Sequence, residues 1–118
     1  MTAPLQCASS TCVVNIFKCL SEETRLRILN LLDSKPLCVC HIEKILGIGS
    51  VRTSQQLAYL KRHGLVDVEI RGTWRVYSIS HSTGPEFEAI LDTLRKSVFP
   101  SDVFQSDRDK LVTESSCL

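Results

Sequence analysis

Two cysteines separated by one residue, Cys38 and Cys40, carry the clearest chemistry in this chain of 118 residues. Thiolates bind soft metal ions and trivalent metalloids, which take three or four such ligands. Residues i and i+2 lie on different sides of a regular helix, so one ion can reach both sulfurs only where the backbone is frayed or distorted. The pair therefore indicates an incomplete thiolate site that needs at least one further ligand.

The composition indicates the cellular compartment in which such a site would function. No apolar run approaches the roughly 18–20 residues of a membrane span, and the first ten residues lack the pattern of a secretion signal. We therefore expect a cytoplasmic protein with no membrane partner. Reducing conditions there keep cysteines as thiols, which favours metal binding or redox sensing over a disulfide framework.

Four other cysteines could complete the site or take no part in it. Cys7 and Cys12, spaced Cys-x4-Cys near the start of the chain, are the candidate additional ligands, although they could also be an incidental pair. Cys19 lies among apolar residues and reads as a small buried hydrophobe. We expect Cys117 to be uninvolved, and His41 to be a solvated histidine rather than a ligand.

Charge is distributed unevenly along the chain. The net charge is only +1, yet residues 50–75 hold five basic and two acidic side chains. A basic face on a near-neutral protein suits contact with duplex DNA rather than general binding of polyanions.

Apolar periodicity and turn residues predict the elements that position these groups. Helices are expected over 13–20, from a cap at Ser21 to 32, over 38–46, 50–63 and 85–98, and strands over 65–70 and 73–79. This order predicts a mainly α fold with a β-hairpin, a winged helix-turn-helix. Residues 1–12 are expected to be a mobile N-terminal segment, 13–98 a domain for DNA binding and dimerisation, and 99–118 a mobile C-terminal tail.

The helix over 50–63 is the predicted recognition helix, and the hairpin is the wing. Arginine can read guanine and glutamine can read adenine, while hydroxyl side chains mostly hold phosphates. The alternative is a solvated helix face and hairpin tip. The candidate DNA contacts are Ser50, Arg52, Thr53, Ser54, Gln55, Gln56 and Tyr59 on the helix, with Arg71 and Arg75 on the wing.

From Val13 to about Val98 the chain resembles the arsenical-resistance repressor (ArsR/SmtB) family. The resemblance is carried by residues 20–29, by Leu-Cys-Val-Cys at 37–40, by 46–48, 54–57 and 64–66, and by the hairpin at 71–78. It implies a homodimeric transcriptional repressor, not an enzyme, that leaves its operator DNA when it binds a thiophilic metal or metalloid. Apolar stripes on the first and last helices are the expected dimer interface.

The resemblance also implies which ions could act as the inducer. The best-known arsenic sensors have a third cysteine where this chain has Glu43, so the missing sulfur must come from elsewhere. We expect As(III) or Sb(III) as the inducer and no organic cofactor. The alternatives are Cd(II) or Pb(II), with Cys7 and Cys12 completing the site as in the cadmium/lead-responsive branch, a repressor released by thiol oxidation, or a constitutive DNA-binding module.

Overall fold

The computed structural model describes residues 10–113, and the side chains of residues 13–112. The elements in chain order are α1 (Ser10–Leu20), α2 (Glu23–Ser34), β1 (Leu37–Cys38), α3 (Val39–Leu46), α4 (Ser50–Arg62), β2 (Val66–Arg71), β3 (Trp74–Ile79), α5 (Pro85–Ser97) and α6 (Asp102–Thr113). The predicted mainly α fold with a β-hairpin is confirmed. Among residues 10–113 no helix is long and apolar enough to cross a membrane.

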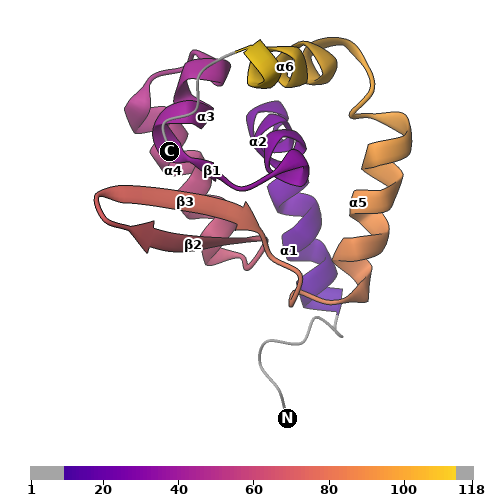
Figure 1. Cartoon of the computed structure of the whole chain (residues 1–118). Helices are drawn as coiled ribbons and strands as arrows, with labels where there is room; N and C mark the ends of the chain where they lie inside the picture. Colours follow the sequence, from indigo (N-terminus) through magenta and orange to yellow (C-terminus); the bar gives the residue numbers. More distant parts are fainter. Residues whose placement is uncertain (1–9, 114–118) are drawn as a thin grey trace.

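Helix α2 lies at the centre of the fold, and the other elements pack around it (Figure 1). Its side chains Ile28, Leu29 and Leu31 are fully buried, together with Leu57 and Leu60 of α4. Burial of this apolar surface is the main source of stability in a domain of this size. Contacts of α2 with α1, α3, α4, α6 and β3 make it the element through which the others are positioned.

Helices α3 and α4 are joined by a tight turn that contains two glycines with positive φ angles. Gly47 ends α3 with φ +67°, and its amide N–H donates to the carbonyl of Glu43. Gly49 precedes α4 with φ +91°. Positive φ angles strain residues that have a Cβ, so these glycines fix the angle between the two helices.

The sheet has three strands in the order β1-β3-β2, one more than the predicted hairpin. In the added strand β1, Leu37 pairs with Tyr77 and Cys38 pairs with Val76. Strand β1 has only two residues, too few for a periodic pattern to be visible in the sequence. This short strand ties the cysteine pair to the wing.

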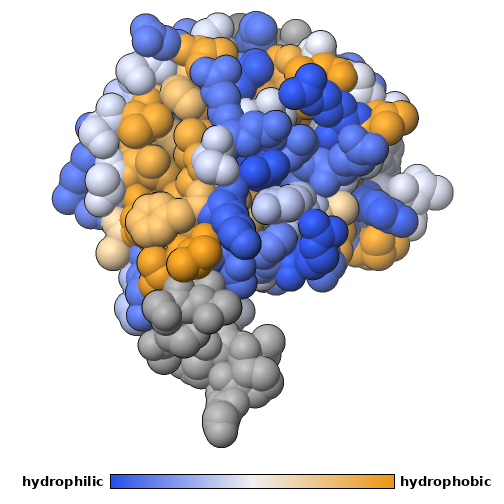
Figure 2. Space-filling model, turned by 180° about the vertical axis from the view of Figure 1, so that it is seen from behind, coloured by the Kyte–Doolittle hydropathy of each residue, from blue (hydrophilic) through white to orange (hydrophobic). Residues whose placement is uncertain are grey.

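Helix α1 has two apolar faces. Ile16 and Cys19 are buried against the core, whereas Val14 and Phe17 are 50% and 57% exposed. Helix α5 lies beside α1 (Figure 1). Seen from behind, hydrophobic side chains gather on the side of the molecule that these two helices form (Figure 2). The expected apolar stripe thus points outward at Val14 and Phe17.

The expectation of a mobile tail over 99–118 is wrong for residues 102–113, which form α6. This helix packs on α2 and α3, with Phe104 and Leu111 buried. Its Asp107 is also fully buried, and it accepts hydrogen bonds of 2.8 and 2.9 Å from Nε and Nη2 of Arg27. The pairing satisfies the buried carboxylate, which is the condition for placing a charge in a core.

Ser21 does not cap α2 as expected. Its hydroxyl donates to the carbonyl of Lys18 at 2.7 Å and so closes the end of α1. Glu22 occupies the N-cap position of α2 without a side-chain cap hydrogen bond.

Candidate thiol site and DNA interface

The sulfurs of Cys38 and Cys40 lie 3.2 Å apart. Cys38 ends β1 with an extended backbone (φ −79°, ψ 158°) and is the N-cap of α3, and Cys40 follows as the second residue of that helix. The change from strand to helix at Cys38 supplies the distortion that brings the two side chains together. Cys38 is buried and Cys40 is half-buried.

The spacing of the two sulfurs suits a shared thiophilic ion. Two thiolates bound to one zinc ion, each at about 2.3 Å, can lie at most about 4.6 Å apart. The observed separation of 3.2 Å falls within that limit. Once the disulfide of Cys40 is reduced, the pair would offer two of the three or four sulfur ligands that As(III), Cd(II) or Pb(II) take.

The remaining ligands are not supplied by the described side chains. Within residues 13–112 no cluster of three histidine, cysteine, aspartate or glutamate side chains could hold a metal ion. Cys7 and Cys117 lie outside the described residues, and Cys12 belongs to α1 but its side chain is not described. Cys40 is disulfide-bonded whereas Cys19 and Cys38 are free thiols, so the sulfur bonded to Cys40 belongs to neither of them.

His41 does not lie on a solvated surface as expected. It is only 1% exposed and faces the core from the first turn of α3. Glu43, at the position of the family's third cysteine, is half-buried one turn along α3.

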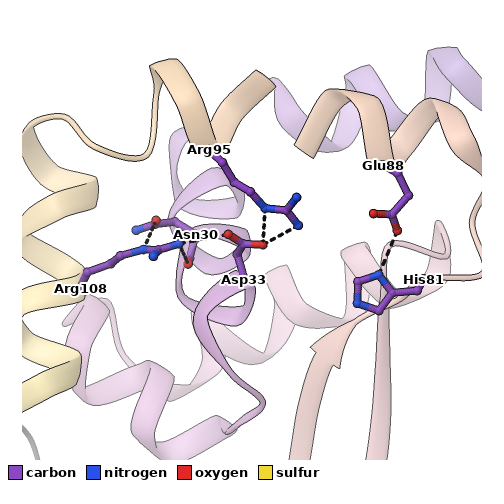
Figure 3. Close-up of polar contacts among 6 residues, drawn as sticks. All are labelled: Asn30, Asp33, His81, Glu88, Arg95 and Arg108. Carbon is purple, nitrogen blue, oxygen red and sulfur yellow. Dashed lines mark hydrogen bonds and ion pairs between the residues drawn. The ribbon is translucent and has the colours of Figure 1, made fainter. Parts of the chain in front are cut away.

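The end of α2, just before the cysteine strand, is fixed to α5 and α6 (Figure 3). The carboxylate of Asp33 accepts a hydrogen bond of 2.8 Å from Nε of Arg95 and one of 3.2 Å from Nη2 of Arg108. Arg108 also donates to the side chain of Asn30 at 2.8 Å. The hydrogen bond to Asp33 raises the pKa of Arg95, so this arginine stays charged. The chain therefore enters β1 from a fixed point.

His81 precedes α5 and pairs with Glu88, with 2.9 Å between Nδ1 and Oε2 (Figure 3). Both side chains are exposed. Within residues 13–112 no third potential metal ligand joins this pair.

On α4, the predicted DNA contacts divide into two groups. Ser50, Arg52, Ser54 and Gln55 are exposed to solvent and available to a duplex. Thr53 is fully buried and its hydroxyl donates to the carbonyl of Gly49 at 2.7 Å, so its assignment as a DNA contact is wrong.

Gln56 and Tyr59 are half-buried and lie against α2. The amide oxygen of Gln56 accepts a hydrogen bond of 2.8 Å from Nη1 of Arg25. The ring of Tyr59 lies under the guanidinium of Arg25 and stacks on His63. The role of Arg25 is not visible in the sequence, because a single arginine in a helix carries no signal of a partner 31 residues away.

The wing presents its two predicted arginines to solvent. Arg71 ends β2 and forms an ion pair of 3.0 Å with Glu69, and Arg75 lies on β3 opposite Ile70. Gly72, with φ +62°, makes the tight turn between the strands. Arg71, Arg75 and the partly exposed Trp74 thus form the tip of the hairpin.

Comparison with known proteins agrees with this architecture. Residues 22–68 match the model of the family described as "Bacterial regulatory protein, arsR family". The chain is 31% identical over 84 residues to the arsenic resistance transcriptional regulator ArsR1 of Pseudomonas putida, covering 70% of the chain and 62% of that protein. It is 39% identical over 70 residues to the cadmium resistance transcriptional regulatory protein CadC of Listeria innocua, covering 58% of the chain and 59% of that protein.

A solved structure is similar in fold as well. It is the homodimeric winged helix-turn-helix DNA-binding domain of a possible ArsR-family transcriptional regulator from Mycobacterium bovis. It has a TM-score of 0.64 and 27% identity, and the match covers 76% of this chain and 83% of that one. The two curated relatives are matched over about three fifths of their own length.

These matches are to transcriptional regulators rather than enzymes, and the fold is a winged helix-turn-helix in which α3 and α4 are the two helices of the motif. Residues 22–68 thus form a domain of the arsR family of bacterial regulatory proteins, and the chain is similar to arsenic and cadmium resistance regulators.

Proposed function

We propose that this protein is a homodimeric repressor that releases its operator when Cys38 and Cys40 bind trivalent arsenic or antimony. The observation that carries the proposal is the 3.2 Å separation of the two sulfurs where β1 becomes α3. Helix α3 leads through the glycine turn into α4, and β1 pairs with the wing strand β3. A ligand at the pair would therefore act on both elements that face DNA.

The DNA contacts are assigned to the exposed residues of α4 and the wing. Arg52 and Gln55 have side chains that can read base edges, while Ser50 and Ser54 suit phosphates. Arg71 and Arg75 at the wing tip suit phosphates or the minor groove. Gln56 and Tyr59 contribute by holding α4 in place.

Dimerisation is assigned to the outward apolar face of α1 and α5. The similar domain from Mycobacterium bovis is homodimeric. Val14 and Phe17 are exposed on α1, and Ile90 and Leu94 of α5 are only partly buried. A second copy of the chain would cover this face and place two recognition helices on one side of the dimer.

Two relatives support two inducers. The regulator from Pseudomonas putida is named for arsenic resistance and the one from Listeria innocua for cadmium resistance. We propose As(III) or Sb(III) first, with Cd(II) or Pb(II) as the alternative. Cys7 and Cys12 are the proposed source of the further sulfur ligands, and a cytoplasmic location stays a prediction.

Ligand binding would need only modest energy to release DNA. Coupling between two sites in one protein is typically about 1–3 kcal/mol, which changes affinity about 5- to 150-fold. Pulling Cys38 and Cys40 onto one ion would alter the β1–β3 pairing at Val76 and the first turn of α3. Both changes reach the DNA-facing elements directly.

The test measures operator affinity with and without inducer, under reducing conditions. A duplex selected by the wild-type protein from a randomised pool serves as operator, and arsenite, Cd(II) and Pb(II) are the probes. Arsenite is expected to weaken binding about tenfold or more. Cys38→Ser and Cys40→Ser should abolish this response but keep DNA affinity, while the control Cys19→Ala should respond normally. An unchanged response in the Cys38→Ser variant refutes the thiol assignment.

The source of the further sulfur is tested in the same assay. The double variant Cys7→Ser, Cys12→Ser is compared with Cys117→Ser, and ultraviolet sulfur-to-metal absorption reports the number of bound thiolates. Loss of the response in the double variant supports the N-terminal ligands. Loss in Cys117→Ser alone assigns the ligand to the end of the chain instead.

Thiol oxidation is the second candidate, because Cys40 is disulfide-bonded and the free thiol of Cys38 lies next to it. Peroxide would join two thiols in one S–S bond and be reduced to two waters. Release of DNA by peroxide, reversed by dithiothreitol, with no effect of arsenite, Cd(II) or Pb(II), would favour this function over metalloid sensing.

A further inference from the structure

Arg25, in the first turns of α2, holds the end of α1. Its Nε donates to the carbonyl of Cys19 at 2.8 Å, and its Nη2 donates to the carbonyl of Lys18 at 3.0 Å. The last carbonyls of a helix have no partner within that helix, and they carry the negative end of its dipole. A guanidinium at this place satisfies them and fixes the end of α1 against α2.

The opposite side of the same guanidinium holds α4. Its Nη1 donates to the amide oxygen of Gln56 at 2.8 Å, and its central carbon lies 4.1 Å from the centre of the Tyr59 ring. Nη1 also bonds Glu22 at 3.1 Å, which places a carboxylate beside the charge. The Arg25 side chain is only 11% exposed, so water competes little for these contacts.

Arginine is suited to this position by its shape. The guanidinium is planar and presents its N–H donors in a fixed fork, and it can stack on an aromatic ring at the same time. A lysine carries the same charge but would offer one flexible ammonium in place of this fork. The contacts made by Arg25 therefore fix an angle between helices as well as neutralise charge.

We propose that Arg25 is a positioning residue for DNA recognition, which sets the placement of recognition helix α4 relative to dimer helix α1. The proposal rests on the proposed function, in which α1 contributes to the dimer interface and α4 enters the major groove. In a symmetric dimer the separation of the two recognition helices sets the spacing of the DNA half-sites. Arg25 thus governs the half-site spacing that the dimer accepts, without touching DNA.

The experiment compares Arg25→Lys with the wild type on a series of duplexes. The wild-type protein first selects its two half-sites from a randomised pool, and their separation is then changed by single base pairs. Arg25→Lys keeps the charge, so affinity for an isolated half-site should stay within about twofold of wild type. Its preference for the selected spacing should fall about tenfold, because one ammonium cannot keep the hydrogen bonds to both α1 and α4.

Arg62→Gln is the matched control. Arg62 also lies over the Tyr59 ring, at 5.1 Å, but it is exposed on α4 and is not among the donors that hold α1. Its loss removes a positive charge near the same ring, so affinity should fall equally at all spacings and the preferred spacing should not change. Circular dichroism and sedimentation confirm that each variant is folded and dimeric.

Different outcomes test the role of Arg25 and the proposed DNA-binding function. A spacing profile of Arg25→Lys that matches wild type overturns the role of Arg25 while leaving DNA binding intact. Failure of the wild-type protein to select any duplex overturns the proposed function itself. Hydrogen exchange of the free protein gives a check without DNA: amides of α4 should exchange at least about tenfold faster in Arg25→Lys, and unchanged exchange contradicts the proposal.

Discussion

Cys19 packs within the hydrophobic core, to which neither cysteine of the pair at the start of α3 belongs. Cys19 is fully buried in the core, and desolvation raises the pKa of its thiol to about 11, although the charges of Arg25 and Arg62 act in the opposite direction. A thiol with such a pKa stays protonated at neutral pH and is a poor metal ligand or nucleophile. Cys19 therefore serves as a small apolar side chain, as the sequence predicts.

The raised pKa of Cys19 gives a pH dependence of stability. The folded state holds the proton more tightly than the unfolded state, whose thiol titrates near 9. This contribution is complete below pH 9 and is lost as the pH rises through about 11. The free energy of unfolding of the wild type, relative to Cys19→Ala, should therefore fall by about 2–3 kcal/mol over this range.

Urea denaturation of the wild type and Cys19→Ala at pH 8, 9, 10 and 11 measures this difference. The alanine variant cancels the titration of all other groups, which are common to both proteins. A constant difference across the series would show that burial does not perturb the thiol.

Residue type alone does not show which polar side chains form hydrogen bonds within the protein instead of facing DNA. Thr53 and Gln56 have side chains suited to DNA, but their partners, Gly49 and Arg25, are inside the protein. The chemistry of Cys38 and Cys40 was predicted, whereas their 3.2 Å separation depends on a strand pairing with Val76 that is 38 residues away. Sequence indicates which groups can react, and long-range contacts decide which of them face outward.

At the level of elements, α6 is a packed helix in a region where the sequence predicts a mobile tail. Phe104, Asp107 and Leu111 recur at spacings of three and four, which is the period of a helix with one buried face. An aspartate in the middle of that face makes the stripe look solvated. Its partner Arg27 lies 80 residues earlier in the chain, so the pairing that permits burial was visible only in the structure.

The Arg27–Asp107 pair is expected to hold α6 in place. The side chain of Asp107 is 1% exposed and that of Arg27 16%, and Asp107 raises the pKa of Arg27, so the arginine stays charged. Removing one member of a buried pair leaves the other charge without compensation and typically costs about 3–5 kcal/mol. Asp107→Ala should therefore lower the free energy of unfolding by about 3 kcal/mol, measured by urea denaturation.

Asp92→Ala is the control for this substitution. Asp92 forms an ion pair of 3.0 Å with Lys96 on the exposed face of α5, and such pairs contribute little because water screens them. Equal losses of stability in the two variants would contradict the anchoring role of Asp107.

In the molecule as a whole, α2 connects the surfaces that function requires. Arg25 near its start joins α1 to α4, and Asp33 near its end joins α5 and α6 beside the cysteine strand. Helices α1 and α5, which carry the proposed dimer face, and α4, the proposed recognition helix, are therefore all connected through α2. A change at the thiol site can act on DNA affinity without separating the dimer, because α3 and β1 lie on the side of the wing (Figure 1).

The proposed dimer face is tested by placing a charge on it. Phe17 is 57% exposed on the apolar face of α1, so Phe17→Asp leaves the core of the monomer intact. A buried, unpaired carboxylate at the interface is strongly unfavourable. The variant should sediment as a monomer, and its affinity for a two-half-site operator should fall about 100-fold or more because the two recognition helices no longer bind together.

Val112→Asp provides the comparison, because Val112 is 85% exposed on α6, away from the face of α1 and α5. It should remain dimeric and bind the operator like the wild type. Within one monomer Arg25 still holds α4 against α1. The Phe17→Asp monomer should therefore bind an isolated half-site with near wild-type affinity. A Phe17→Asp variant that remains dimeric would move the interface to another surface and remove the link between α1 and half-site spacing.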